Sequence, residues 1–390
     1  MYQQQRNHLI TSAAILFGLA TLPLLSGCRD SDDDSTATSS TWQSVATGGT
    51  NFHTLAIKVD GTLWAWGDNS HSQLGNGAAG NLTRPAQIGT ASNWSTVVVG
   101  ASHTIATKVD GTLWGWGANQ HGQLGNSVVT DKITPTQIGT DSNWSNIATG
   151  WAHTVAIKSD QTLWTWGNNW YGQLGDGTTI TRSAPTQVGS ATDWQSVVAG
   201  PYHTLAIKGD GSLWGWGVNW GGQLGDGSAV NRAAPVQIGT GTDWKVIAAG
   251  GWHTLAIKND GTLWGWGINS NGQLGNGTMG GNRWSPEQVG TDSRWAHVAT
   301  GNAHVIASKS DGTLWAWGDN YFGQLGDGTI VSKFAPLQIG SDINWGALVT
   351  GSSSSFAIKS DRSLWAWGDN SFSQLGDDSV KNKLSPVSIK

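Results

Sequence analysis

The 390-residue sequence is weakly acidic and rich in glycine and tryptophan, with a formal net charge of −5, only 12% charged residues, 56 Gly and 26 Trp. A nucleic-acid-binding protein needs a basic footprint, so this charge balance excludes nucleic acid as a partner. Low charge, many glycines and the lack of a helical periodicity in most of the chain favour short strands and tight turns.

Residues 1–27 have the pattern of a secretory signal. Arg6 supplies their only formal positive charge, and the run from Leu9 to Leu25 is mostly apolar with no ionisable side chain. This run is shorter than a typical membrane-spanning helix and small residues follow it, so cleavage is favoured over a transmembrane segment.

The end of this segment, Leu25-Ser26-Gly27-Cys28, resembles the lipobox of bacterial lipoproteins, in which the cysteine is acylated and becomes the first mature residue. An ordinary cleavage site with an incidental cysteine is the alternative. Cys28 is the only cysteine, so no internal disulfide is expected. Residues 28–41 form an acidic, Ser/Thr-rich stretch that we predict to be a disordered tether. We therefore expect an exported lipoprotein of the bacterial cell envelope, held to a membrane only by the lipid on Cys28.

The rest of the chain is built from seven copies of one unit, marked by the motif Leu63-Trp64-Ala65-Trp66-Gly67, which returns about every 50 residues. A period of this size indicates a repeat architecture. Side chains alternate along a strand, so the two tryptophans share one face and the smaller residues the other, which lets successive sheets nest. The predicted propeller domain spans 42–390, with repeats near 42–89, 94–139, 144–189, 194–239, 244–290, 295–340 and 345–389.

Each repeat predicts four strands. The first, Trp-x-x-Val-x-x-Gly, ends in small residues and should be innermost, where seven strands converge. The second is joined to the tryptophan strand by an Asp-Gly turn. Two repeats replace that glycine with Gln161 and Arg362, so their turns should be strained or of another type. The fourth strand carries a proline, as at Pro85, which belongs on an edge. We predict an all-β, seven-bladed β-propeller of four-stranded antiparallel blades.

The motifs Gly-x-x-His-Thr-x-Ala, Asp-Gly-x-Leu-Trp-x-Trp-Gly and Asn-x-x-Gly-Gln-Leu-Gly resemble the regulator of chromosome condensation repeat, over residues 42–389. The resemblance implies a seven-bladed propeller and, from the family's founding activity, guanine-nucleotide exchange on a nuclear GTPase beside chromatin. An exported lipoprotein has neither, and it is closer in setting to the bacterial secreted branch, which includes a β-lactamase inhibitory protein that grips its target with aromatic loops. A plant ultraviolet-B photoreceptor of this family relies on an arginine-braced tryptophan cluster, for which this propeller has few arginines.

Several repeated polar residues are candidates for chemistry. Six histidines share one repeat position, which Ser354 takes in the seventh: His53, His103, His153, His203, His253 and His304. A shared metal needs nitrogens at about 2.0 to 2.1 Å, whereas equivalent residues around an axis stand apart, so structural hydrogen bonding is favoured over metal binding. Hairpin chemistry explains the recurring Lys-x-Asp pairs. The sequence has no nucleophile elbow, phosphate loop or isolated acid pair, so we expect no enzyme, no metal and no cofactor.

Aromatic residues outside the repeat pattern fall in loops on one face of the predicted propeller. They are Phe52, Trp151, Trp170, Tyr171, Tyr202, Trp220, Trp252, Tyr321, Phe322 and Phe372. Partly buried loop packing is one interpretation; recognition of a protein or a glycan is the other. We expect a monomeric scaffold that binds a protein partner through this face, such as an envelope or secreted enzyme. A glycan-binding or carbohydrate-active surface protein is the alternative.

Overall fold

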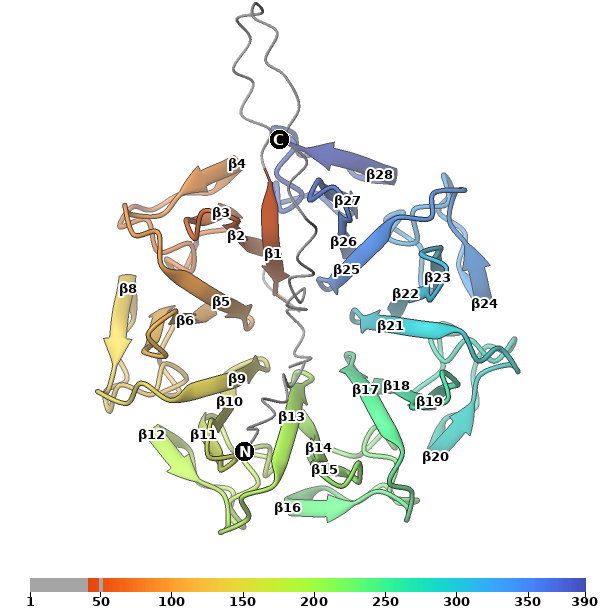
Figure 1. Cartoon of the computed structure of the whole chain (residues 1–390), viewed down its shortest axis with the longest axis horizontal. Coiled ribbons are helices and arrows are strands. Elements are labelled where there is room, and N and C mark those ends of the chain that lie inside the picture. The colour runs from red at the N-terminus through yellow and green to blue at the C-terminus, as the bar shows by residue number, and fades with distance from the viewer. Residues whose placement is uncertain (1–40, 49–51) are drawn as a thin grey trace, which may run out of the picture.

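The computed structural model describes residues 41–48 and 52–390, which form a closed ring of seven blades around a central axis (Figure 1). Each blade is a four-stranded sheet whose strands lie in chain order, as in β1-β2-β3-β4. Neighbouring strands pair antiparallel throughout a blade. The predicted all-β, seven-bladed propeller is confirmed. Within the described ranges, we find no helix of the length and apolarity needed to cross a membrane.

The strands repeat with nearly constant length from blade to blade. The first strands are β1 (Trp42–Thr47), β5 (Trp94–Val99), β9 (Trp144–Thr149), β13 (Trp194–Ala199), β17 (Trp244–Ala249), β21 (Trp295–Thr300) and β25 (Trp345–Thr350). The second strands are β2 (His53–Lys58), β6 (His103–Lys108), β10 (His153–Lys158), β14 (His203–Lys208), β18 (His253–Lys258), β22 (His304–Lys309) and β26 (Ser354–Lys359). The third strands are β3 (Leu63–Gly67), β7 (Leu113–Gly117), β11 (Leu163–Gly167), β15 (Leu213–Gly217), β19 (Leu263–Gly267), β23 (Leu314–Gly318) and β27 (Leu364–Gly368). The fourth strands are β4 (Leu82–Gln87), β8 (Lys132–Ile138), β12 (Arg182–Gln187), β16 (Arg232–Gln237), β20 (Arg283–Gln288), β24 (Lys333–Gln338) and β28 (Lys383–Ile389).

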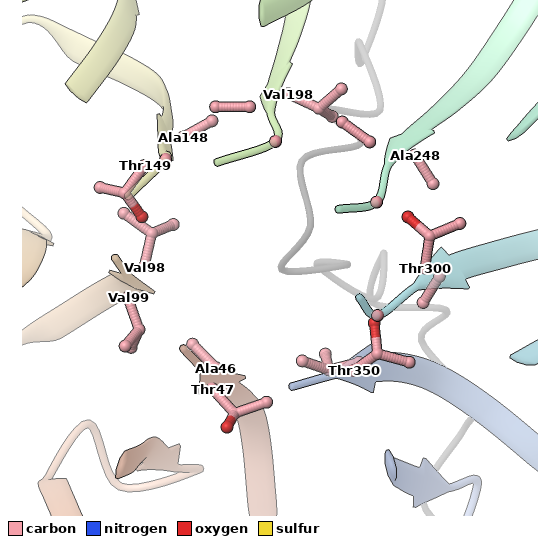
Figure 2. Close-up of a pocket in the computed structure, with 18 of the residues that line it drawn as sticks. Ala46, Thr47, Val98, Val99, Ala148, Thr149, Val198, Ala248, Thr300 and Thr350 are labelled. Carbon is pink, nitrogen blue, oxygen red and sulfur yellow. The ribbon is translucent and has the colours of Figure 1, made fainter. Parts of the chain in front are cut away.

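The first strand of every blade lies at the axis and the proline-containing fourth strand lies at the rim (Figure 1). Figure 2 shows the small side chains that make this convergence possible, among them Ala46, Val98 and Thr300. Proline has no backbone N–H to donate to a neighbouring strand. It is tolerated in the fourth strand because this strand is the outer edge of its sheet. Both placements agree with the sequence pattern.

Successive blades nest large side chains against small ones. Trp66 of the first blade is fully buried and packs in one cluster with Leu364 and Ala366 of the last blade. The opposite face of the first blade offers Leu63 and Ala65 to Trp116 of the second. The tryptophan face of each blade therefore fills the space over the small face of the blade before it, as the alternation along the third strand predicts.

A tryptophan hydrogen bond joins every pair of neighbouring blades, and a hydroxyl bond accompanies it in all blades but the sixth, which has Val305 in place of the threonine. Trp66 Nε1 donates to the Gln374 carbonyl oxygen at 2.8 Å, and Thr54 Oγ1 donates to the same oxygen at 2.9 Å. The tryptophan bond recurs as Trp116–Gln73, Trp166–Gln123, Trp216–Gln173, Trp266–Gln223, Trp317–Gln273 and Trp367–Gln324. The glycine after Gln-Leu is required for this approach, because a Cβ on Gly376 would lie 2.6 Å from Trp66 Nε1. Since each sheet comes from one repeat, side chains rather than a shared sheet close the ring.

Two hairpin turns hold a non-glycine residue in the left-handed region, as expected. The backbone φ is +64° at Gln161 and +68° at Arg362, against +78° at Gly61 in the standard turn. The turn itself is unchanged: Gln161 N donates to Lys158 O at 2.8 Å, just as Gly61 N donates to Lys58 O at 2.9 Å. These two turns are therefore strained copies of the common type rather than turns of a different type.

The up-and-down course of the strands gives the propeller two different faces. The loops that join first to second and third to fourth strands lie on one face, which we call the loop face. The short turns between second and third strands, and the connections between blades, lie on the other, the turn face. Equivalent positions of all seven blades thus share a face. The repeat position of a non-consensus residue therefore tells on which face of the propeller it lies.

Candidate binding face

Seven ring side chains on the loop face form one continuous network, which we call the aromatic cluster. Its members are His121, Trp151, Trp170, Tyr171, Tyr202, Trp220 and Trp252, from the second to the fifth blade. Neighbouring ring centroids lie between 5.0 and 6.2 Å apart. Most pairs are edge-on or tilted, the arrangements that aromatic quadrupoles favour.

A simple rule of the fold creates the cluster. The loop after the third strand of one blade lies beside the loop after the first strand of the next. Trp220 of the fourth blade therefore meets Trp252 of the fifth, at 6.2 Å and nearly parallel. Tyr171 meets Tyr202 in the same way, one blade earlier, at 5.7 Å.

The outer members of the cluster lie in the loops between third and fourth strands. Two of them, Trp170 and Trp220, extend into solvent from loops that are held by internal hydrogen bonds. Trp170 and Trp220 are 56% and 54% exposed, whereas the asparagine before each is fully buried. Asn169 accepts from Leu174 N at 3.0 Å and donates to the Thr178 carbonyl at 3.0 Å, and Asn219 makes the equivalent bonds. These bonds join the start of each loop to its later residues and hold the loop in one conformation. The indole rings therefore project from a rigid loop.

The inner members, Trp151, Tyr202 and Trp252, lie in the loops between first and second strands. Backbone hydrogen bonds join several of these loops to the equivalent loop of the next blade. Ala101 N donates to Trp151 O at 3.2 Å, and Trp151 N donates to Pro201 O at 3.0 Å. Gly251 N continues the pattern by donating to Gly301 O at 3.1 Å. Backbone bonds therefore join the first loops of blades two to four and of blades five and six, and Trp151, Tyr202 and Trp252 are partly buried on these loops.

Four of the ten predicted aromatics lie outside the cluster. Phe52 and Phe372 stack on each other at 4.8 Å across the junction of the first and last blades. Tyr321 and Phe322 contact each other at 5.0 Å within the sixth blade. Tyr321 and Phe322 have no aromatic neighbour in the next blade, which has Ser352 and Ser353 in its first loop.

His121 is the cluster member that the sequence analysis missed. It lies 5.0 Å from Trp170 and 5.9 Å from Trp151, between the two rings. Its repeat position is that of Tyr171, Phe322 and Phe372. Counting histidine among the aromatics at that position would have found it.

The aromatic cluster carries no charge at neutral pH. Burial lowers the pKa of His121 below its ordinary value of 6.5. Burial, with a smaller contribution from Tyr171, raises the pKa of Tyr202 above 10.0. Both rings are therefore neutral, and the surface they form is apolar with polar edges.

The other half of the loop face differs at one repeat position, the residue just before the loop asparagine. Blades six, seven and one have a carboxylate there, Asp319, Asp369 and Asp68, whereas blades two to five have Ala118, Asn168, Val218 and Ile268. Each carboxylate accepts from the glutamine of its own loop, at 2.8, 3.0 and 2.7 Å. At this repeat position the loop face therefore has three carboxylates in one half and none in the half that carries the aromatic cluster.

All six repeated histidines are buried, and four of them, His53, His103, His153 and His304, make the predicted structural hydrogen bond to a hydroxyl of the next blade. His103, His153, His253 and His304 are fully buried, and burial lowers the pKa of each to about 3. His153 Nε2 pairs with Thr204 Oγ1 of the next blade at 3.2 Å, and His304 Nε2 with Ser355 Oγ at 3.0 Å. Val305 takes the threonine position after His253, so this pair is missing there, and His203 also lacks it although Thr254 is in place. No group of three potential metal ligands occurs in residues 41–48 and 52–390.

The Lys-x-Asp pairs are also explained by local structure. Asp60 Oδ1 accepts from Thr62 N at 3.0 Å and from Thr62 Oγ1 at 2.6 Å, and Trp64 Nε1 donates to that hydroxyl at 2.9 Å. Lys58 Nζ lies 3.7 Å from the centroid of Trp64, a cation–π contact that recurs in all seven blades. These residues stabilise the hairpins of the turn face.

Comparison with known proteins decides the family. Residues 26–296 match the RCC1-like domain, and residues 295–324 and 311–358 match the regulator of chromosome condensation (RCC1) repeat. The chain belongs to the RCC1-like family. The family resemblance of the repeat motifs is therefore confirmed.

Relatives of this RCC1-like propeller are distant. A stretch of 46 residues is 48% identical to the X-linked retinitis pigmentosa GTPase regulator homolog of Caenorhabditis elegans, and it covers 11% of this chain but only 3% of that protein. Human WBSCR16 has a TM-score of 0.76 at 21% identity over 84% of this chain and 94% of its own. Prp20p of Saccharomyces cerevisiae has a TM-score of 0.77 at 22% identity over 86% and 87%. At these identities the two structures show a shared fold alone.

The predicted lipidation site, Cys28, lies outside the described residues, as do the signal segment and most of the tether. The structure does show where the chain joins the propeller. Val59 N donates to Thr41 O at 3.1 Å, and Trp42 N donates to Arg362 O at 3.0 Å. Val59 and Arg362 belong to hairpins of the turn face, so the chain joins the ring on the side opposite the aromatic cluster.

Proposed function

We propose that this RCC1-like propeller is a binding scaffold that captures a protein partner on the aromatic cluster. The observation that carries the proposal is the cluster itself: seven contacting rings from four blades, with two indoles more than half exposed. Tryptophan and tyrosine on rigid supports are the residues that most often dominate the energy of protein interfaces. RCC1-like propellers are in general binding or regulatory proteins, which agrees with this role.

The burial pattern argues against loop packing as the purpose of these rings. The consensus Trp66 and its six equivalents are fully buried and hydrogen-bonded across a seam. Trp170 and Trp220 instead extend from loops, and more than half of each side chain faces solvent. Leaving large apolar surfaces in water has no benefit for folding, so a cluster of them indicates a surface that another molecule covers.

A glycan ligand is the second candidate, because exposed indole faces such as those of Trp170 and Trp220 can also stack on sugar rings. We favour protein because the cluster is larger than one sugar and extends from outer to inner loops. Guanine-nucleotide exchange is not proposed for this chain. Prp20p has binding properties toward Gsp1p and histones, but a likeness at 22% identity carries the fold and not the partner.

We also propose that the protein is exported and anchored through Cys28, as a monomer that presents its loop face to an envelope or secreted enzyme. This geometry is supported by the chain joining the ring at the turn face, because an amino-terminal anchor would leave the aromatic cluster facing away from the membrane. Stable anchoring needs more than one acyl chain, which lipoprotein processing supplies. Cys28→Ser should move the protein from membrane to soluble fractions or leave it unprocessed. Unchanged membrane association of this variant would contradict the anchor.

The binding proposal is tested by affinity capture with the full-length protein followed by mass spectrometry, and then by measuring the affinity of the purified partner. Trp170→Ala with Trp220→Ala should weaken binding at least thirtyfold, because each interface anchor typically contributes about 2 kcal/mol or more. Tyr321→Ala is the matched control, since Tyr321 is an exposed aromatic on the same face outside the cluster. Equal binding by the double variant and the control would overturn the proposal. Binding of oligosaccharides instead of protein, lost in the same variant, would favour the glycan alternative.

A further inference from the structure

A cavity of about 200 Å³ runs along the axis of the propeller. Its wall is made by the first strands of the blades, with the side chains of Ala46, Val98, Val198, Ala248 and Thr350 around it (Figure 2). Most of the wall is methyl and methylene surface. Apolar cavities of about 150 Å³ already bind small apolar molecules in other proteins, so this one has room for an alkyl chain.

The repeat is broken where this cavity meets the turn face. Lys245, the second residue of β17, and His297, the third residue of β21, both line the cavity. The other six blades have Gln, Ser, Ala or Gly at the position of Lys245, and Ser, Thr, Asn, Val or Ala at that of His297. Two adjacent blades therefore place a lysine, Lys245, and a histidine, His297, at the same end of the cavity.

Lys245 differs from the repeated lysines of the turn face. Those lysines lie over tryptophan rings, and several pair with an aspartate, as Lys158 does with Asp141 at 2.6 Å. Lys245 is exposed, and within residues 41–48 and 52–390 no carboxylate lies within ion-pair distance of it. It is a cation at the end of an apolar cavity with no ion-pair partner among the described residues.

His297 is arranged to donate a hydrogen bond beside that cation. Its Nδ1 lies 3.0 Å from Ser308 Oγ. If the serine hydroxyl donates to Nδ1, the proton of the neutral ring is on Nε2, which is then the hydrogen-bond donor of a ring that lines the cavity. Burial and, to a smaller extent, the charge of Lys245 lower the pKa of His297.

We propose that the axial cavity binds an aliphatic carboxylate, with the alkyl chain along the apolar wall and the carboxylate between Lys245 and His297. The wall selects for an unbranched apolar chain, and the mouth selects for a single anionic head that can accept from an ammonium and an imidazole. This site opens on the turn face, so it is independent of protein capture on the aromatic cluster.

Isothermal titration calorimetry of the full-length protein with octanoate, octan-1-ol and octylamine tests the proposal. Octanoate should bind at one site, tighter than the alcohol, and octylamine should bind weakest because its ammonium meets Lys245. Shortening octanoate to hexanoate should weaken binding about fifteenfold, since it removes two methylenes and each buried methylene changes affinity roughly fourfold. Equal binding of octanoate and octylamine, or no binding of octanoate at millimolar concentration, would overturn the proposal.

The variants copy residues that other blades already have, so that the fold is kept. Lys245→Ser copies the second and third blades and should weaken octanoate about tenfold while leaving octan-1-ol nearly unchanged, because a charge-assisted hydrogen bond is lost. Ala199→Val with Ala249→Val copies Val99 and should weaken both probes several-fold by narrowing the cavity. Lys381→Ser, an exposed lysine on the loop face, is the control and should change neither. Octanoate binding that survives both Lys245→Ser and the valine pair would place the ligand elsewhere and refute the site.

Discussion

The tryptophans of the blade seams and those of the loop face are chemically identical and have different roles. At the seams, Trp66 and its equivalents are fully buried and donate to a backbone carbonyl of the blade before. On the loop face, Trp170 and Trp220 extend from hydrogen-bonded loops and are mainly in contact with other rings and solvent. The first set recurs in all seven blades and holds the ring together, whereas the second occurs in particular blades only. Position within the repeat, not residue type, therefore separates stability from recognition.

The largest effect is expected from breaking a seam. Trp66→Ala removes a fully buried indole between the first and last blades and leaves the Gln374 carbonyl with one donor fewer. Creating a cavity of this size typically costs about 3 to 5 kcal/mol. Urea denaturation should show this loss of unfolding free energy. A variant as stable as the native protein would mean that the seam tryptophans do not hold the ring.

The next effect should appear in binding and not in folding. Trp151→Ala with Trp252→Ala removes two inner members of the aromatic cluster, and each truncated anchor should reduce partner affinity roughly thirtyfold. Both side chains are only partly buried, so the melting temperature should fall far less than in Trp66→Ala. Comparing affinity and melting temperature in one set of variants makes the separation measurable. If the double variant is as destabilised as Trp66→Ala, these rings are core and the binding-face hypothesis is wrong.

Sequence patterns could predict most of the seams and six of the seven cluster residues, but not which of those rings contact one another. The alternation in Leu63-Trp64-Ala65-Trp66 and the proline of the fourth strand determine which faces pack and which strand lies outside, because both depend on one repeat. Contacts such as that of His121 with Trp151 join the loop after the third strand of one blade to the loop after the first strand of the next. The distance between these two loops is not specified by the sequence of a single repeat. The same limit hid Lys245 and His297, which lie in consecutive repeats and line one cavity only because their blades pack around a common axis.

Acid should weaken the seams. Burial lowers the pKa of His103, His153, His253 and His304 to about 3 and that of His203 to about 4, against 6.5 in an unfolded chain. Between these values the unfolded state binds more protons, so stability is complete above about pH 6.5 and falls as the pH decreases toward 3 to 4. Each histidine contributes a slope of up to about 1.4 kcal/mol per pH unit. Urea denaturation from pH 7 to pH 5 measures it. A free energy of unfolding that stays constant over this range would show that the buried histidines are protonated in the folded state.

The smallest effect concerns a position where stability and the repeat disagree. Gln161 adopts φ +64° in a turn where five other blades have glycine. Gln161→Gly removes the steric cost of the left-handed region but increases the freedom of the unfolded chain, and the two contributions partly cancel. The expected gain is therefore below about 1 kcal/mol, seen as a small rise in melting temperature. Because the turn is on the turn face, affinity for a partner on the aromatic cluster should not change. A loss of stability would mean that the Gln161 side chain makes a favourable contact that outweighs its backbone strain, and a change in affinity would show that the two faces are coupled.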